Sequence, residues 1–261
     1  IESIKECLNI ANLKDYEITD IAFNTQPLKN IIPKFLFLLR NFNFKKYSSI
    51  NRLKKKVNIR KFLFENFKLN KNVKFHYIEH HLAHIASAFY PSELKDAFGL
   101  SIDGSGDFVT FALAECKNNK ISIKKRTFFP NSLGIFYHGM TQFLGFKNYG
   151  DEYKMMGLAA YGKPIYFDKI QNNLFKNYND GMFKLNLKYF NHHRYNFQYI
   201  SNENLVIGQI YNDELLILFK DEINQQPNRE QFTKDFASSV QKVYEFFFKK
   251  ILNNLMNNNF S

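Results

Sequence analysis

The pattern of apolar and polar positions along the chain predicts a mixture of helices and short strands. Apolar residues recur at helical spacing over Ile1–Ala11, and Tyr16–Phe23 is expected to follow as a short strand. Leu28–Leu69 is expected to be mainly helical and positively charged, and Phe75–Ile78 is expected to be a strand. That last strand leads directly into a run of histidines.

Three further strands are predicted in the middle of the chain. Asp96–Ile102 is apolar enough for a buried strand, and Phe108–Ala114 is expected to be its hairpin partner. Ile121–Phe128 alternates between apolar and polar residues, with Lys117–Lys120 as the turn before it. These segments are expected to form an antiparallel sheet.

The last third of the chain contains the clearest helix in the sequence. Phe232–Leu255 places apolar residues on one side of a helix, namely Phe236, Val240, Val243, Phe247 and Ile251. Before it, Asn172–Arg194 is rich in asparagine and prone to turns, with a short alternating strand at Phe183–Leu187. No internal repeat is visible.

Composition and charge permit a large folded core but name no partner. The 261 residues are 45% hydrophobic and include 30 phenylalanines, and the formal net charge is +12. The basic residues concentrate only at Lys45, Lys46, Arg52–Lys56, Arg60, Lys61, Lys68 and Lys71. A solvated helical face is favoured over a nucleic-acid footprint for this patch.

The number of cysteines and the hydropathy of the sequence argue against disulfide-rich, zinc-knuckle and membrane-spanning proteins. Cys7 and Cys116 are too few for a disulfide framework or a zinc knuckle, and both are expected to be buried thiols. No uninterrupted apolar run of about 18 residues occurs, so no membrane span is expected. A cytoplasmic protein is the default expectation.

The histidine run is the first candidate for chemistry. If residues 80–88 are helical, His80 and His84 stand one turn apart on one face and can hold one metal ion. Glu79 could orient a ring, and Asp103 is a nearby carboxylate. On spacing alone, histidines that only hydrogen-bond inside the core remain the favoured interpretation.

A glycine-rich segment follows the first of the three central strands. In Asp103-Gly104-Ser105-Gly106-Asp107, the glycines let backbone N–H groups face an anion at close range, and a carboxylate at a strand end can hold a metal or a water. The same letters also make an ordinary turn. The weight of this segment therefore depends on the motifs around it.

Two later motifs complete a family pattern, namely Ser132-Leu133-Gly134 and the segment Gly150–Gly162. With the histidine run and the Asp-Gly-x-Gly segment, they occur in the order found in carbamoyltransferases of the nodulation and antibiotic-tailoring type. The chain resembles that family densely over residues 78–164. The amino-terminal domain of the family is similar to the tRNA threonylcarbamoyl transferase. Asp107 and Ala160 depart mildly from the family, which usually has Glu and Pro there.

The resemblance implies an incomplete α/β domain of the actin/sugar-kinase-like (ribonuclease-H-like) type, with a mixed sheet and flanking helices. Residues 15–75 look like a variable, mainly helical insertion, residues 76–164 like the motif-bearing core, and residues 165–261 like a second segment ending in a long helix. The family's carboxy-terminal YrdC-like domain is expected to lie outside this chain. The chain therefore looks like an internal fragment, and the isolated piece is expected to be inactive.

The function implied is O-carbamoyl transfer from carbamoyl phosphate, through a carbamoyl adenylate made with ATP, to a hydroxyl of a small molecule or sugar. The resemblance places the metal, iron with zinc as the alternative, on His80 and His84. It implies catalytic roles for His81, Asp103 and Lys154. It implies nucleotide-binding roles for Gly104, Gly106, Glu152, Gly157 and Gly162. The other histidines, His76, His138, His192 and His193, are expected to be structural or exposed.

Two other functions stay open at this point. One is a related transferase acting on tRNA, with the basic patch as its footprint. The other is a non-catalytic fragment that binds a nucleotide or a partner subunit. A homodimer is compatible with the sequence, and no membrane partner is expected.

Overall fold

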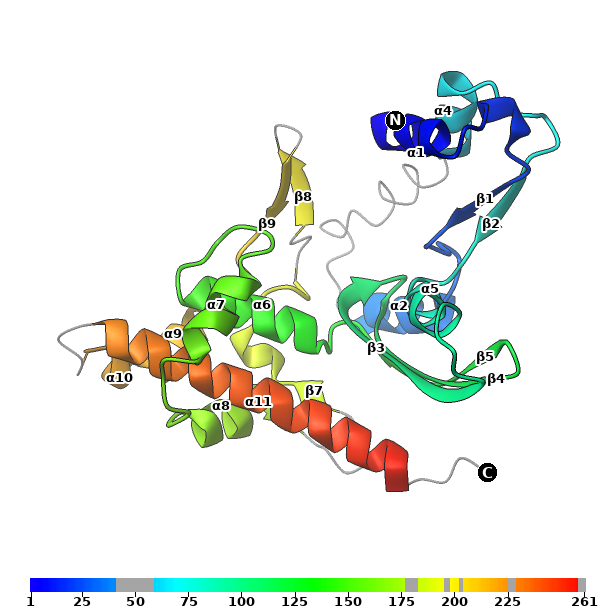
Figure 1. Ribbon diagram of the computed structural model, residues 1–261. Coiled ribbons are helices and arrows are strands. Elements are labelled where there is room, and N and C mark those ends of the chain that lie inside the picture. The colour runs from blue at the N-terminus through cyan, green and yellow to red at the C-terminus, as the bar shows by residue number, and fades with distance from the viewer. Residues whose placement is uncertain (41–58, 177–182, 195–197, 202–203, 225–228, 258–261) are drawn as a thin grey trace.

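The computed structural model describes residues 1–40, 59–176, 183–194, 198–201, 204–224 and 229–257. Figure 1 shows two bodies side by side, one built on the sheet of β3, β4 and β5 and the other built around the long helix α11. No helix in the described part of the chain is both long and apolar enough to cross a membrane. The candidate site lies where these two bodies meet.

An antiparallel sheet of three strands forms the first body, as the sequence pattern predicts. Its strands, in spatial order, are β3 (Asp96–Gly106), β4 (Val109–Lys117) and β5 (Lys120–Phe128). In the middle strand, side chains alternate between two faces, so Phe111 belongs to the main core whereas Ala112 belongs to a smaller core beneath α5. The middle strand is therefore covered on both faces.

The hairpin turn between β3 and β4 lies at Asp107 and Phe108, where φ is 48° and 74°. Positive φ at both central residues gives a turn whose twist matches that of antiparallel strands. The preceding Asp103–Ser105 segment forms a bulge, because Ile102 pairs with Phe111 but Gly106 pairs with Val109. The Asp-Gly-Ser-Gly segment is thus part of β3 and not the turn itself.

Helix α5 (His80–Phe89) packs on this sheet, and its predicted position is confirmed. Ile85 and Phe89 are buried against the smaller core, one turn apart. Gly99 on β3 allows the close approach, because a Cβ there would lie 2.4 Å from Cγ2 of Ile85. Packing therefore fixes the position of the helix that carries the histidine run.

The N-terminal part contributes a small sheet of its own. Its elements are α1 (Glu2–Ile10), η1 (Asp15–Glu17), β1 (Asp20–Phe23), α2 (Ile31–Arg40), α4 (Ile59–Asn66) and β2 (Lys74–Tyr77). Strands β1 and β2 pair in parallel and are separate from β3–β5, so the expected single mixed sheet does not occur among the described residues. The predicted strand at Tyr16–Phe23 begins only at Asp20, after a 3₁₀ turn.

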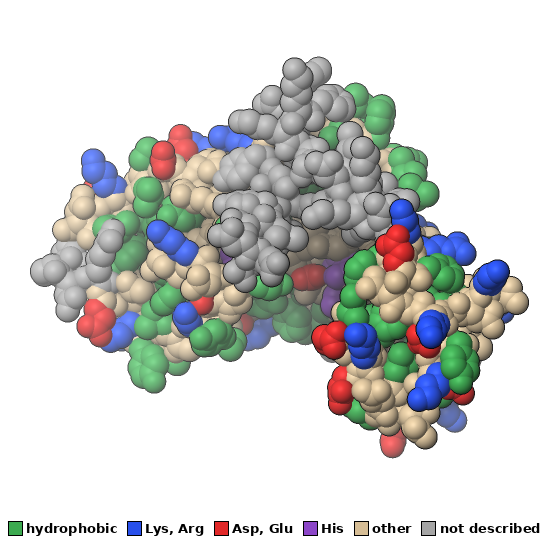
Figure 2. Space-filling model, turned by 90° about the horizontal axis from the view of Figure 1, so that it is seen from above, with side chains coloured by type: hydrophobic (Ala, Val, Ile, Leu, Met, Phe, Trp, Pro, Cys, Tyr) green, Lys and Arg blue, Asp and Glu red, His purple; other side chains and the backbone are tan. Residues whose placement is uncertain are grey.

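Two other expectations concern this N-terminal part. Cys7 is exposed, contrary to the prediction, because α1 has no buried residue, whereas Cys116 is buried as expected. The part of the basic patch at residues 45, 46 and 52–56 lies outside the described residues. Figure 2 shows Lys and Arg side chains scattered over one face of the molecule.

The second body is mainly helical. Its helices are α6 (Leu133–Phe143), α7 (Glu152–Ala159), α8 (Phe167–Leu174), η3 (Leu187–Tyr189), α9 (Asp213–Leu218), α10 (Lys220–Asn224) and α11 (Arg229–Asn257). Two short strand pairs complete it, β6 (Phe175–Lys176) with β7 (Lys184–Leu185) and β8 (Gln198–Ser201) with β9 (Asn204–Ile207). The strand predicted at Phe183–Leu187 is therefore only two residues long, followed by η3.

Helix α11 organises this body, and the apolar side predicted for it is confirmed. The five residues of that side are all 3% exposed or less, and α6, α7 and α8 pack along the helix (Figure 1). Aromatic rings dominate the contact, with Phe236 at 4.9 Å from Phe143 and 5.1 Å from Phe219 between ring centroids. The largest core of the chain is therefore built against one helix.

Phe236→Ala should lower the free energy of unfolding by about 3–5 kcal/mol, because it removes a fully buried ring and leaves a cavity. Denaturant unfolding followed by circular dichroism measures the change. Lys242→Ala on the exposed side of the same helix is the control and should change stability by less than about 0.5 kcal/mol. Equal effects of the two substitutions would contradict this packing.

Candidate metal centre

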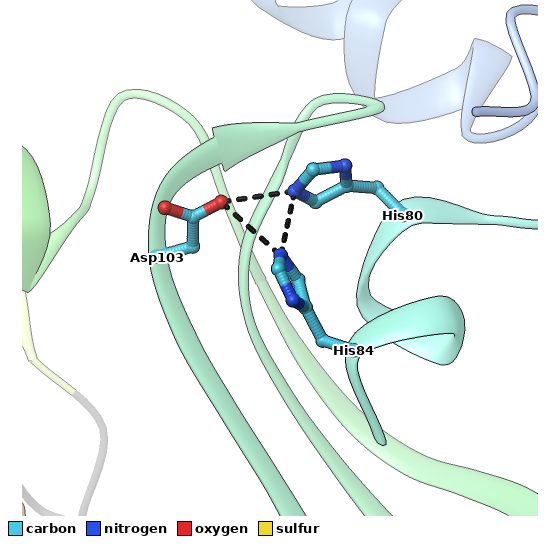
Figure 3. Close-up of side chains that lie close together, drawn as sticks. All are labelled: His80, His84 and Asp103. Carbon is cyan, nitrogen blue, oxygen red and sulfur yellow. Dashed lines mark hydrogen bonds and ion pairs between the residues drawn. The ribbon is translucent and has the colours of Figure 1, made fainter. Parts of the chain in front are cut away.

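Three potential ligand atoms converge where helix α5 faces the bulge of β3. His80 Nε2 lies 2.9 Å from Asp103 Oδ2 and 2.9 Å from His84 Nε2, and His84 Nε2 lies 3.7 Å from Asp103 Oδ2 (Figure 3). The exposed fractions of the three side chains are 22% for His80, 50% for His84 and 41% for Asp103. The cluster is therefore partly shielded but open on one side.

This arrangement fits a single metal ion. Ligand atoms held about 2.0–2.2 Å from a metal at tetrahedral or octahedral angles are separated from each other by about 2.8–3.6 Å. The three separations here, 2.9, 2.9 and 3.7 Å, match those edges closely. Two imidazole nitrogens and one carboxylate oxygen form a donor set used for Fe²⁺ and Zn²⁺. The donor set therefore fits either metal.

His80 is held in the orientation that a metal ligand needs. Its Nδ1 lies 3.3 Å from the backbone oxygen of Asn24, and because a carbonyl only accepts, Nδ1 carries the proton. Nε2 is then the nitrogen available to the cluster. Gly106 makes room for the ring, since a Cβ at that position would lie 2.0 Å from His80 Cδ2.

Asp103 is fixed by contacts to both bodies. The Gly104 N–H donates to its Oδ1 at 2.6 Å, and the Ser132 hydroxyl donates to its backbone oxygen at 2.9 Å. Ser132 also caps helix α6 by accepting from the Ile135 N–H. The Ser-Leu-Gly motif thus joins the bulge to α6, where a Cβ on Gly134 would lie 2.7 Å from the Gly104 nitrogen.

The electrostatics of the pair are mutually consistent. Without a metal, a proton on Nε2 of His80 donates to Asp103, and this hydrogen bond lowers the pKa of Asp103 to about 2 and raises the pKa of His80 above its ordinary value. A bound metal would take the place of that proton. Asp103 is therefore ionised at neutral pH. An ionised carboxylate beside two imidazoles attracts a cation.

The structure places His81 away from the cluster. Its side chain is fully buried between α5 and the sheet, where Nε2 donates to the Val109 carbonyl at 2.9 Å and Nδ1 accepts from the Ser101 hydroxyl at 2.8 Å. Burial lowers the pKa of this imidazole, which favours its neutral form. Both nitrogens are therefore engaged in anchoring the helix to β3 and β4.

Two carboxylates hold the first turn of α5. Glu79 is the N-cap, accepting from the backbone N–H groups of His81 and Leu82 at 3.3 and 3.1 Å, so it caps the helix and orients no ring. Asp107, in the hairpin turn, accepts from the His80 N–H at 3.1 Å and from the Gln26 N–H at 2.6 Å. The N-terminal segment, the hairpin and the histidine helix are thus tied together.

The cluster opens on a cavity of about 580 Å³ between the two bodies. His80, Asp103, Gly104 and Glu152 all line it. Figure 2 shows histidine and acidic side chains in a recess between the bodies. A cavity of this size lies within the range of small-molecule sites. Of the five residues predicted to contact the nucleotide, Gly104 and Glu152 belong to its wall.

The remaining predicted residues on and around α7 lie elsewhere. Lys154 pairs with Asp151 at 2.7 Å and is not among the described residues that line the cavity. A Cβ on Gly157 would meet nothing within 4 Å, whereas one on Gly162 would lie 2.0 Å from the backbone oxygen of Lys234. Gly162 thus permits a close approach of this segment to α11.

One histidine of the cavity wall makes a contact that the sequence did not predict. His138 on α6 is buried, and its Nδ1 forms a short contact with Glu152 on α7. The two residues are 14 positions apart on different helices, so no local spacing could reveal the pair. Of the other histidines, His192 and His193 are buried and His76 pairs with Asp20 at 2.6 Å.

Fold and site together define a mixed α/β chain with a candidate site for one metal ion beside a small-molecule cavity. Residues 9–260 match the family described as "Carbamoyltransferase N-terminus". The chain belongs to that carbamoyltransferase family.

Relatives with this similarity come from several organisms. An uncharacterized protein of Synechocystis sp. is 45% identical over 114 residues, which is 44% of this chain and 18% of the relative. Nodulation protein NolNO of Sinorhizobium fredii is 41% identical over 90 residues, 34% of this chain and 13% of that protein. Nodulation protein NolO of Bradyrhizobium diazoefficiens is 34% identical over 112 residues, 42% of this chain and 20% of that protein. The chain thus matches only a small share of the length of each.

His84→Ala should reduce the affinity for Zn²⁺ at least about 100-fold. Removing a direct metal ligand weakens binding more than removing a residue that only hydrogen-bonds to a ligand, which usually costs about 10–100-fold. Competition with a chromogenic chelator measures the affinity. His76→Ala, which removes a histidine outside the cluster, is the control and should bind Zn²⁺ as the unaltered chain does. Unchanged affinity in His84→Ala would show that the cluster is not the metal site.

Gly106→Ala should weaken Zn²⁺ binding about 10–100-fold, because its Cβ displaces the His80 ring. Gly104→Ala is a matched control two residues away, where a Cβ meets nothing within 4 Å, and its affinity should stay within about 2-fold. Neither glycine has positive φ, so the backbone accepts alanine at both. Equal affinities for the two variants would contradict the geometry of His80.

Proposed function

We propose that this chain is the metal-bearing part of an O-carbamoyltransferase, which transfers a carbamoyl group from carbamoyl phosphate, through carbamoyl adenylate, to a hydroxyl of a small molecule or sugar. The observation that carries this proposal is the cluster of His80, His84 and Asp103, of which His80 and Asp103 line a ligand-sized cavity, in a chain of the carbamoyltransferase family.

The donor set supports a bound Fe²⁺ or Zn²⁺, with iron the metal that the family resemblance favours. Such an ion would act as a Lewis acid on a carbamoyl or phosphate oxygen. His80, His84 and Asp103 would hold it, Asn24 would orient His80, and Gly104 would orient Asp103. The chain's own contribution is therefore a rigid set of ligands facing the cavity.

The cavity supports a ligand that combines an anionic group with a larger, partly aromatic part. The metal cluster lies at one part of its wall, and Tyr149, Met156 and Tyr244 supply apolar surface at others. Carbamoyl adenylate has a matching character, since it joins a carbamoyl phosphate group to a nucleoside. Gly104 and Glu152 are the predicted nucleotide contacts that this placement supports.

The contacts of the other predicted catalytic and nucleotide-binding residues give less support to those roles. His81 is better explained as an anchor of α5, because both of its nitrogens bond to the sheet. A role for Lys154 in catalysis requires that it leave Asp151 and reach into the cavity. Gly162 serves packing against α11, and Gly157 has open space around it.

We also infer that the first body is part of an actin/sugar-kinase-like, ribonuclease-H-like domain. The support is the order of its elements, in which three antiparallel strands are followed by helix α6, with an aspartate-bearing bulge close to the first hairpin. The domain boundaries at residues 15–75, 76–164 and 165–261 belong to the same proposal.

The test is an assay of the full-length natural protein loaded with Fe²⁺. With ATP, ¹⁴C-carbamoyl phosphate and hydroxylamine as the trapping nucleophile, it should release AMP and form labelled hydroxyurea. His80→Ala should lower this rate at least about 100-fold, because removal of an electrostatic stabiliser costs that much or more. His76→Ala is the control and should retain the rate. AMP and hydroxyurea formation that is equally fast in His80→Ala would contradict the proposal.

A further inference from the structure

The cavity wall contains a buried base that the family match does not assign. Among the cavity-lining residues described by the structure, only His138 has a buried side-chain polar atom without a hydrogen-bond partner, its Nε2. The residue is 6% exposed. A buried, unsatisfied nitrogen is costly, so a site that keeps one is expected to satisfy it with a ligand group.

The second nitrogen of the ring determines what that ligand group must be. Nδ1 contacts Oε1 of Glu152, and the hydrogen bond from His138 lowers the pKa of that glutamate, so the carboxylate is ionised and only accepts. The proton of a neutral imidazole is then on Nδ1, and Nε2 has a free lone pair. Nε2 can therefore accept a hydrogen bond from a donor such as a hydroxyl group.

The neighbouring groups are poor alternatives as a base. Burial raises the pKa of Tyr137 to about 12, and its hydroxyl already donates to Gln241 at 2.8 Å. His80 and Asp103 belong to the candidate metal cluster, where their side-chain atoms would hold the ion. His138 is the other imidazole among the described residues of this wall, and its Nε2 has no hydrogen-bond partner.

We propose that His138 is the general base that accepts the proton of the acceptor hydroxyl, with Glu152 as the positioning residue behind it. This inference rests on the proposed function. The acceptor oxygen bonds to the carbamoyl carbon of the adenylate, the bond from that carbon to the phosphate oxygen breaks, and AMP leaves with that electron pair. The hydroxyl proton moves to Nε2 of His138, while the proton on Nδ1 remains hydrogen-bonded to Glu152.

The test compares nucleophiles that need a base with one that does not. Full-length protein receives ATP and carbamoyl phosphate with either methanol or hydroxylamine, and water is present in both reactions. Methyl carbamate and AMP report attack by hydroxyls, and hydroxyurea reports attack by hydroxylamine, whose lone pair needs no proton removed first. The two readouts separate proton transfer from adenylate formation.

His138→Gln should lower attack by methanol and water about 100-fold, the usual contribution of a general base, and leave hydroxyurea formation within about 3-fold. Glu152→Gln should lower the ratio of hydroxyl attack to hydroxylamine attack about 10-fold, whatever its effect on nucleotide binding, and it provides a second variant should the buried substitution unfold the chain. His193→Gln changes another buried histidine outside the cavity wall and should match the unaltered protein in both reactions.

The outcomes are distinct. Equal loss of both reactions in folded variants, or no loss in either, would overturn the assignment of His138 while leaving the transferase function intact. Hydroxyurea without any attack by methanol or water in the unaltered protein would also overturn it. Absence of both hydroxyurea and AMP in the unaltered protein would overturn the proposed function, and the inference with it.

Discussion

The first turn of helix α5 rests on the tip of the β3–β4 hairpin, and the geometry of the candidate site depends on that contact. Asp107 in the turn binds the His80 N–H and the Gln26 N–H, so one carboxylate holds the histidine helix and the N-terminal segment together. Gly106 beside it leaves room for the imidazole. Because the backbone is fixed on both sides of His80, its Nε2 meets Asp103 without any adjustment of the fold.

The three histidines of one short run have two different environments because a helix distributes neighbours over different faces. His80 and His84, four positions apart, share the face toward the bulge of β3. His81 faces the sheet, where both of its nitrogens form hydrogen bonds. The bulge brings Asp103 back toward the pair, and Ser132 joins the same bulge to the second body. The cavity between the bodies is therefore bounded by a metal cluster on one side and by His138 with Glu152 on the other.

The sequence pattern was sufficient for the elements with strong periodicity, including α5, the three-stranded sheet and the buried side of α11. It was also sufficient for the pairing of His80 with His84, since helical spacing is local. It could not reveal the positive-φ turn at Asp107 and Phe108, because two central residues other than glycine are unusual there. Nor could it reveal the His138–Glu152 pair, which forms only when α6 and α7 pack. Separate small sheets replaced the expected mixed sheet because strand partnership is a tertiary property.

The most direct test of the central claim is X-ray absorption spectroscopy of the chain loaded with one equivalent of Zn²⁺. If His80, His84 and Asp103 hold the metal, the spectrum will show nitrogen and oxygen ligands at about 2.0–2.2 Å and the outer-shell scattering of two imidazoles. A spectrum without imidazole scattering, or with sulfur at about 2.3 Å, would contradict the assignment.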